Sequence, residues 1–115
     1  LGVSYKPNVK DIQLSPAESI IRKLESLAIK IKIYDPYFTS TIVFSQKTQE
    51  NFLDAITNVD ACIFVTAHNE FYDIDPTFLL SKMKTPIVID TRGIFDPHVV
   101  KKAGLTYRGI GRGGV

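Results

Sequence analysis

The hydrophobic positions of the chain follow two different periods, one helical and one extended. Residues 15–28 repeat apolar side chains at the i, i+3, i+4, i+7 spacing of a helix that buries one face. Ser15 is a good N-cap, Pro16 suits the first helical position because its missing N–H has no partner there anyway, and Glu18 completes a capping box. We therefore predict a helix over residues 15–28, with an apolar face made of Ala17, Ile20, Ile21, Leu24, Leu27 and Ala28.

Other segments show the apolar runs or the alternation typical of β-strands. In residues 29–33 isoleucines alternate with lysines, and Pro36 closes the segment because proline cannot donate to a strand ladder. Residues 60–67 contain an unbroken apolar run, as expected for a strand covered on both faces at the centre of a sheet. The predicted strands cover residues 1–5, 29–33, 60–67, 85–92 and, as an edge strand, 105–110.

Helical signals separate these strands. Further helices are predicted over residues 48–59, 75–83 and 96–104, and residues 41–45 fit neither period. Strands that alternate with helices pair in parallel through right-handed crossovers. The predicted fold is therefore α/β: an open, mostly parallel Rossmann-like sheet of four to five strands with helices on both faces, in one domain over residues 1–115.

Composition changes this picture little but weighs against several classes of function. The 115 residues are 44% hydrophobic and 23% charged, and no apolar run reaches the roughly 18 residues that a membrane span needs. The net charge of +2 is too small and too scattered for a nucleic-acid surface. We expect no membrane and no nucleic-acid partner.

The chemistry of cysteine and histidine also limits the options. Cys62 is the single cysteine, so it forms no internal disulfide, which favours a reducing, cytoplasmic location. It lies in an apolar strand, where burial makes a thiol a poor nucleophile. His68, His98 and Cys62 share no metal-ligand spacing, so no metal site is predicted.

Polar residues collect where the predicted strands end, at the edge where open parallel sheets bind ligands. Lys6 precedes a capped helix, so its loop could hold a phosphate or diphosphate; the alternative is a solvated lysine. Arg92 could clamp a phosphate or carboxylate, or pair with Asp90 or Asp96. The residues at these strand ends are Tyr5 and Lys6, Asp35, Thr66 to His68, and Asp90 with Arg92.

Three other signals have a structural interpretation. Asp35 and Asp90 could be taken for catalytic carboxylates, but aspartates at such positions are equally turn and cap residues. His68 could shuttle a proton or simply hydrogen-bond within its loop, and no partner carboxylate or serine is apparent. The segment GIGRGG, residues 109–114, matches G-x-G-x-x-G, but no helix follows as a dinucleotide fingerprint requires.

With these residues in view, the chain resembles the carboxyl-terminal domain of the UDP-glucose/GDP-mannose dehydrogenase family, NAD-dependent enzymes that oxidise a nucleotide sugar to its uronic acid. The resemblance covers essentially the full length. It is carried by LGVSYKPNVKDIQLSPA, IYDPY, DACIFVTAHNEF, VIDTRGIFD and YRGIGR, in the family's order and spacing. The YKPNVKD and GIGR segments are more similar to the branch that acts on UDP-N-acetylmannosamine than to the UDP-glucose branch.

The resemblance implies that the chain is a fragment, the closing domain of a larger, homo-oligomeric dehydrogenase. The NAD-binding domain and a central helical region with the catalytic cysteine would lie outside these residues, and that cysteine would carry a thiohemiacetal and a thioester during two oxidations of the UDP-sugar. By resemblance, Tyr5, Lys6 and Arg92 bind the UDP-sugar. Gln13 is the cofactor-binding candidate; it stands where many members carry an arginine that reaches NAD, and it lacks that charge. No catalytic residue is expected in this chain.

Two hypotheses from other classes stay open at this point. One is a non-catalytic flavodoxin-like or receiver-like interaction module, and the other is a surface for assembly. A receiver needs an acidic cluster around a phosphoacceptor at a central strand end, whereas the central strand here ends in FVTAH.

Overall fold

The computed structural model describes residues 1–110, and its core is a three-stranded parallel sheet. The strands β3 (Ala61–Phe64), β4 (Ile87–Asp90) and β5 (Thr106–Gly109) lie side by side in chain order, with Cys62 opposite Val88 and Val88 opposite Tyr107. The strand predictions around residues 60–67, 85–92 and 105–110 are thereby confirmed. The G-x-G-x-x-G match at residues 109–114 lies largely outside the described residues.

Five helices connect and cover these strands within the described part of the chain. They are α1 (Pro16–Ser26), α2 (Phe52–Ile56), α3 (Asn69–Tyr72), α4 (Pro76–Lys82) and α5 (Pro97–Lys102). Aspartate caps begin α4 and α5, and Ser15 caps α1 by accepting from the N–H of Ala17 at 3.2 Å. The capping box is only half formed, because the N–H of Ser15 donates to Ile12 and the Glu18 side chain bonds Arg22 instead.

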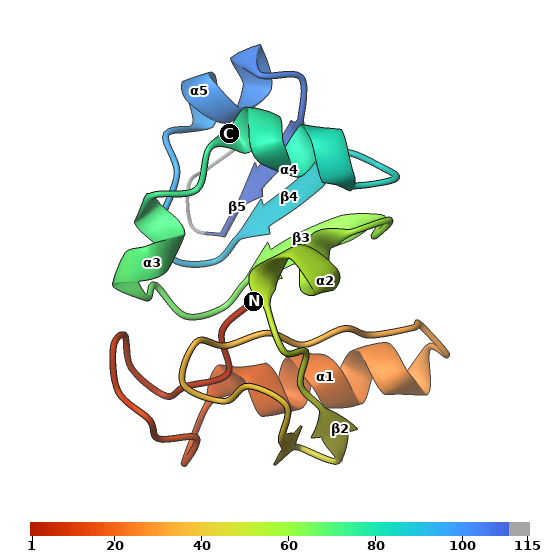
Figure 1. Ribbon diagram of the computed structural model, residues 1–115, viewed down its shortest axis with the longest axis vertical. Coiled ribbons are helices and arrows are strands. Elements are labelled where there is room, and N and C mark those ends of the chain that lie inside the picture. The colour runs from red at the N-terminus through yellow and green to blue at the C-terminus, as the bar shows by residue number, and fades with distance from the viewer. Residues whose placement is uncertain (111–115) are drawn as a thin grey trace.

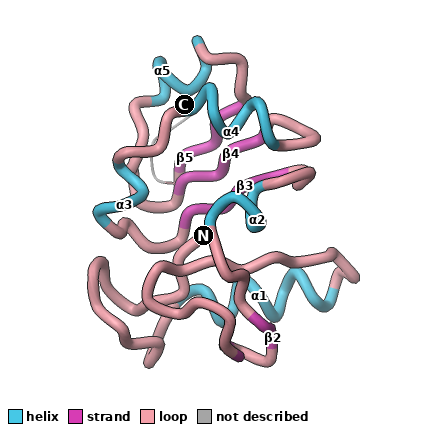
Figure 2. Tube along the Cα trace, viewed as in Figure 1, coloured by secondary structure: helices cyan, strands magenta, loops and turns pink. Residues whose placement is uncertain are grey.

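The prediction of four to five strands is wrong, because two predicted strands are irregular. Residues 1–5 and 29–33 contain no assigned strand and run as loops in Figure 2. In the first, the N–H groups of Val3 and Ser4 donate to the side chain of Asp35, so they are not available to a ladder. In the second, Ile33 accepts from the N–H of Gln49 at 2.7 Å, and the ammonium of Lys32 donates to the carbonyls of Asp54 and Thr57 at 3.1 and 3.0 Å.

These irregular segments nevertheless extend the order of the sheet. Leu1 donates to the carbonyl of Ile63 at 2.7 Å and accepts from the N–H of Val65 at 2.8 Å, so the N-terminus lies along β3 (Figure 1). Gly2 in turn donates to the carbonyl of Tyr34 at 2.9 Å. The spatial order is therefore residues 33–34, residues 1–3, β3, β4, β5, which is the order 2-1-3-4-5 of flavodoxin-like sheets.

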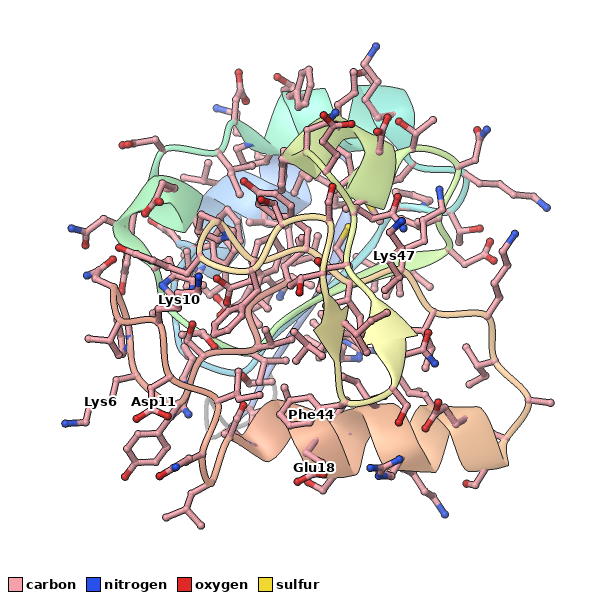
Figure 3. The ribbon with its side chains drawn as sticks, turned by 60° about the horizontal axis from the view of Figure 1, so that its bottom comes forward. Lys6, Lys10, Asp11, Glu18, Phe44 and Lys47 are labelled. Atoms are coloured by element: carbon pink, nitrogen blue, oxygen red, sulfur yellow. The ribbon has the colours of Figure 1, made fainter. Side chains whose placement is uncertain are left out.

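An antiparallel hairpin resolves the ambiguous residues 41–45. Strand β1 (Ile42–Val43) pairs with β2 (Gln46–Lys47) through a turn in which Phe44 and Ser45 have φ of 51° and 66°. Two central residues with positive φ are the mark of a type I′ turn. The hairpin lies against α1, with Phe44 next to the helix (Figure 3) and Gln46 donating to Glu25 at 2.7 Å.

Two apolar clusters occupy opposite faces of the sheet. The larger contains Cys62 and Phe64 of β3, together with buried residues of β4, β5 and the helices α2 to α5. Successive strand residues point to opposite faces, so Ile63 packs instead with Val3, α1 and the hairpin in the smaller cluster. No helix within residues 1–110 is long and apolar enough to span a bilayer.

Candidate functional site at the carboxyl edge of the sheet

The carboxylate of Asp35 organises the edge where the strands end. Its Oδ2 accepts from the N–H of Val3 at 2.8 Å and from the N–H and hydroxyl of Ser4 at 3.2 and 3.1 Å. Its Oδ1 accepts from the N–H of Tyr37 at 2.8 Å. The side chain is completely buried, so its charge is offset by donors from two separate segments.

His68 supplies a further donor to this carboxylate. Its Nε2 lies 2.8 Å from Oδ2 of Asp35, and its Nδ1 accepts from the backbone N–H of Asn8 at 2.8 Å. Because an N–H points at Nδ1, that nitrogen offers its lone pair, and the ring proton belongs on Nε2, where it is donated to Asp35. The imidazole is completely buried, with the rings of Tyr37 and Phe71 at centroid distances of 5.1 and 5.6 Å.

Competing effects set the ionisation of Asp35. Burial is the largest influence and by itself raises the pKa of this carboxyl. The hydrogen bonds from His68, Val3 and Tyr37 together outweigh burial, and they hold the pKa of Asp35 below its ordinary value. Asp35 therefore acts as a fixed negative acceptor and not as an acid–base group, in agreement with its structural interpretation.

Gly2 and Thr66 bring the first segment and β3 into close contact. A Cβ at residue 2, whose φ is 93°, would lie 2.7 Å from both the backbone nitrogen and the Cβ of Thr66. The hydroxyl of Thr66 donates to the carbonyl of Ser4 at 2.8 Å, next to Tyr5. The start of the loop that carries Tyr5 and Lys6 is thus attached directly to the end of β3.

Arg92 reaches the same edge from β4. Its Nε donates to the carbonyl of Val65 at 3.0 Å, and its N–H donates to Oδ1 of Asp90 at 3.1 Å. Neither Asp90 nor Asp96 forms an ion pair with the guanidinium among the described residues, so the predicted alternative of an intrachain pair is not observed. The Arg92 side chain is exposed, and none of the ion pairs among residues 1–110 involves it.

Tyr5 and Lys6 lie in an exposed loop. Figure 3 shows Lys6 extending into solvent beside Asp11, and its Nζ lies 5.9 Å from the centre of the Tyr5 ring. Lys10 from the same loop lies 5.8 Å from the ring centre of Phe38. The structure thus places Lys6 and Arg92 on segments that meet at one edge, through Ser4, Thr66 and Val65.

Gln13 lies at the far end of this loop, just before α1. It is exposed, its N–H donates to Oδ1 of Asp11 at 2.9 Å, and its neutral amide adds no charge to the edge. Cys62 is buried against Met83, with the sulfur atoms 3.7 Å apart, and burial raises the pKa of its thiol to about 11. The thiol is therefore unreactive at neutral pH, as the sequence indicated.

Sequence reasoning missed the partnership of His68 with Asp35 and the role of Asn8. Both His68 and Asp35 follow predicted strands, and that shared position was the available signal. Their direct contact depends on tertiary structure, since the two residues are 33 positions apart.

The fold and this edge define a class: parallel α/β domains, in which ligands bind beyond the carboxyl ends of the strands where the strand order reverses. Comparison with known proteins identifies the family within that class. Residues 1–97 match the model of the UDP-glucose/GDP-mannose dehydrogenase family, UDP binding domain, and the chain belongs to this family.

The chain is similar to relatives of two kinds, which are named for different UDP-sugars. It is 32% identical over 115 residues to UDP-glucose 6-dehydrogenase of Rhizobium meliloti, covering 97% of this chain and 26% of that protein. It is also 32% identical over 117 residues to UDP-N-acetyl-D-mannosamine dehydrogenase of Methanococcus vannielii, with 97% and 26% covered. The chain spans about a quarter of the length of the curated relatives it matches.

Solved structures agree with this assignment. The UDP-D-ManNAc dehydrogenase from Pyrococcus horikoshii superposes with a TM-score of 0.82 at 30% identity, over 99% of this chain and 25% of that one. The UDP-N-acetyl-mannosamine dehydrogenase from Staphylococcus aureus gives a TM-score of 0.74 at 25% identity, over 97% and 25%.

Proposed function

We propose that this chain is the nucleotide-sugar-binding domain of an NAD-dependent UDP-sugar dehydrogenase, and that it closes over the UDP-sugar in a homo-oligomeric, cytoplasmic parent enzyme. The observation that supports the proposal is that the segments carrying Lys6 and Arg92 are both attached to the end of β3, and that neither cation forms an ion pair among residues 1–110. Lys6 lies two residues after Ser4, whose carbonyl accepts from the hydroxyl of Thr66. The Nε of Arg92 donates to the carbonyl of Val65, the residue before Thr66. A diphosphate is the part of a UDP-sugar that such an edge attracts.

The two cations have different roles in this proposal. Only the Nε of Arg92 is used in its bond to Val65, which orients the guanidinium and leaves the terminal nitrogens to donate to phosphate oxygens. Lys6 contributes a point charge on a flexible stem. Tyr5, 41% exposed beside Lys6, offers a ring surface and a hydroxyl to the nucleotide or sugar.

The described residues 1–110 offer no site of their own for NAD in this proposal. Gln13 is neutral and exposed, and residues 1–110 contain no glycine-rich strand–turn–helix of the dinucleotide-binding kind. We assign NAD and the catalytic cysteine to the remainder of the parent enzyme. The part of this domain is to bind, orient and enclose the substrate, and no step of hydride transfer belongs to it.

UDP-N-acetylmannosamine is the substrate we propose for the parent enzyme. The sequence YKPNVKD of residues 5–11 supports this substrate, as does the similarity to the Pyrococcus structure. The parent enzyme should oxidise UDP-N-acetylmannosamine with a larger kcat/KM than UDP-glucose. The reverse preference would identify UDP-glucose as the substrate and leave the binding role of this domain unchanged.

A titration of the 115-residue chain with UDP tests the site directly. We expect amide shift changes in two-dimensional NMR at Tyr5, Lys6 and Arg92. Lys6→Ala and Arg92→Ala should each weaken UDP binding about tenfold or more, because a charge-assisted hydrogen bond contributes roughly 1.5–3 kcal/mol. Lys47→Ala is the matched control, since Lys47 is an exposed lysine on β2, away from this loop (Figure 3).

In the parent enzyme, Lys6→Ala should raise the KM for the nucleotide sugar more than the KM for NAD. Equal effects on both substrates, or shift changes confined to residues remote from Lys6 and Arg92, would contradict the proposal.

A further inference from the structure

The loop of residues 5–11, which carries Lys6, is attached at its middle to the interior of the domain. Its ends are joined by the bond from the N–H of Tyr5 to the carbonyl of Asp11. Its middle is held at Asn8, whose N–H donates to Nδ1 of His68 and whose side-chain oxygen accepts from the N–H of Asn69 at 2.9 Å. Asn8 adopts a φ of 62°, a conformation that asparagine tolerates better than most residues.

The imidazole of His68, whose Nδ1 holds Asn8, is itself held in place on its other side. Nε2 of His68 bonds Asp35, and Asp35 bonds Val3 and Ser4, the residues that lead into the same loop. The rings of Tyr37 and Phe71 pack against the imidazole. The ring therefore stands between a fixed anion on one side and the middle of an exposed loop on the other.

We infer that His68 is a positioning residue for the UDP site: its Nδ1 holds Asn8, and through Asn8 the loop, in the conformation that presents Lys6 to the diphosphate. The inference rests on the proposed UDP-binding function. His68 touches neither phosphate nor sugar in this scheme. It lowers the cost of binding, because a loop that is already ordered loses less conformational entropy when the ligand arrives.

Two substitutions separate the two nitrogens of the ring. The oxygen of His68→Asn takes the place of Nδ1 and can accept from Asn8, but it loses the donor to Asp35. The amide nitrogen of His68→Gln takes the place of Nε2 and can donate to Asp35, but it loses the acceptor for Asn8. Stability should therefore follow the contact with Asp35, and UDP affinity should follow the contact with Asn8.

The expected results are opposite for the two variants. His68→Gln should weaken UDP binding at least fivefold while its thermal midpoint falls less than that of His68→Asn. His68→Asn should bind UDP within about twofold of the unchanged chain at a temperature where both are folded. Equal losses of affinity in the two variants, or retained affinity in His68→Gln, would overturn the inference.

Measurements without ligand make the result independent of UDP. In the unchanged chain the imidazole nitrogen shifts should show a protonated Nε2 and a bare Nδ1, and the Asn8 amide should resist hydrogen exchange. His68→Gln should lose that protection and gain fast motion over residues 6–10 in heteronuclear NOE data. A rigid loop in His68→Gln overturns the positioning role; a rigid loop in the unchanged chain that binds no UDP overturns the proposed function instead.

Asn8→Ala tests the attachment of the loop from its exposed side, should His68→Gln fail to fold, although alanine keeps the backbone N–H that donates to His68. Alanine loses the bond to Asn69 and disfavours the φ of 62°. We expect about threefold weaker UDP binding with global stability nearly retained. Unchanged affinity together with a disordered loop would contradict the inference.

Discussion

Asp35 and Asp90 are both completely buried, and each carboxylate faces hydrogen-bond donors. Asp90 accepts from the N–H groups of Arg92 and Phe95 and from the hydroxyl of Tyr107. A carboxylate with its lone pairs occupied in this way fixes the turn around it. At the scale of single residues, the two aspartates thus shape the edge, and the cations beside them are left to meet a ligand.

Replacing Asp35 tests this role. Asp35→Asn leaves an N–H facing the donor of Val3 or of Tyr37, so we expect the free energy of unfolding at pH 7 to fall by about 2–4 kcal/mol. The folded pKa of Asp35 lies below the unfolded value of roughly 3.9, so its contribution is present above that pH and is lost as pH falls through the folded pKa.

Urea unfolding between pH 2 and 7 measures this effect. The difference in stability between the unchanged chain and Asp35→Asn should shrink on acidification, while the exposed Glu50→Gln shows no such change. A difference that stays constant with pH would contradict an ionised Asp35.

Cys62 gives a second pH-dependent prediction, at the alkaline end. Its pKa is about 11 in the folded chain and roughly 8.5 when unfolded, so the folded state holds the proton more tightly. Its contribution to stability is complete below pH 8.5 or so and is lost, by about 1.4 kcal/mol per pH unit, as pH rises toward the folded pKa. Denaturant unfolding of the unchanged chain and Cys62→Ala from pH 8 to 10.5 should show this steeper decline only with the thiol.

The same thiol should react with a disulfide reagent at pH 8 only in denaturant. Rapid labelling under native conditions would show that the cluster around Cys62 opens readily.

At the scale of elements, the hairpin carries a turn that its residues do not favour. Ser45 has a φ of 66° and is exposed, and left-handed backbone costs most residues roughly 1–2 kcal/mol. Glycine removes this strain but loses more conformational entropy on folding, so the gain is smaller than the strain itself. Ser45→Gly should therefore raise the free energy of unfolding by about 0.5–1 kcal/mol. Thermal unfolding checks the sign, and Ser19→Gly, at an exposed position within α1, should show the opposite one.

Elements with local signals could be predicted, and those that depend on distant partners could not. The helix α1 follows from Ser15, Pro16 and its apolar period, and β3 and β4 from their apolar runs. The predicted strand at residues 1–5 was wrong because Asp35, about thirty positions away, takes its backbone donors. Helix α3 has only four residues, too few for a period, and Phe44 and Ser45 give no glycine or asparagine signal for a turn.

The candidate site follows the same rule. The carboxyl edge could be located from the strand ends, whereas the contacts within it could not. No local pattern connects His68 with Asn8, which precedes it by 60 positions.

At the scale of the whole molecule, residues 1–4 pack along β3 between the two apolar clusters, a contact that we call the seam. Gly2→Ala would place a methyl group against Thr66 at a φ of 93°, so we expect a loss of about 3 kcal/mol from overlap and backbone strain together. Gly104→Ala is a matched control, because φ there is 105° but the nearest contact is the flexible end of Leu80 at 3.3 Å. Chemical denaturation should rank Gly2→Ala well below Gly104→Ala; equal losses would show that the seam is loose.

The carboxylate of Asp35 bonds the backbone of Val3, 32 positions before it, and the imidazole of His68, 33 positions after it. A partly unfolded domain therefore cannot retain the ordered loop of residues 5–11, which carries Lys6, after the rest of the sheet edge has unfolded. On heating, UDP binding and the native fold should be lost at the same temperature. The fraction of chain that still binds UDP and the fraction that is still folded should then follow one melting curve.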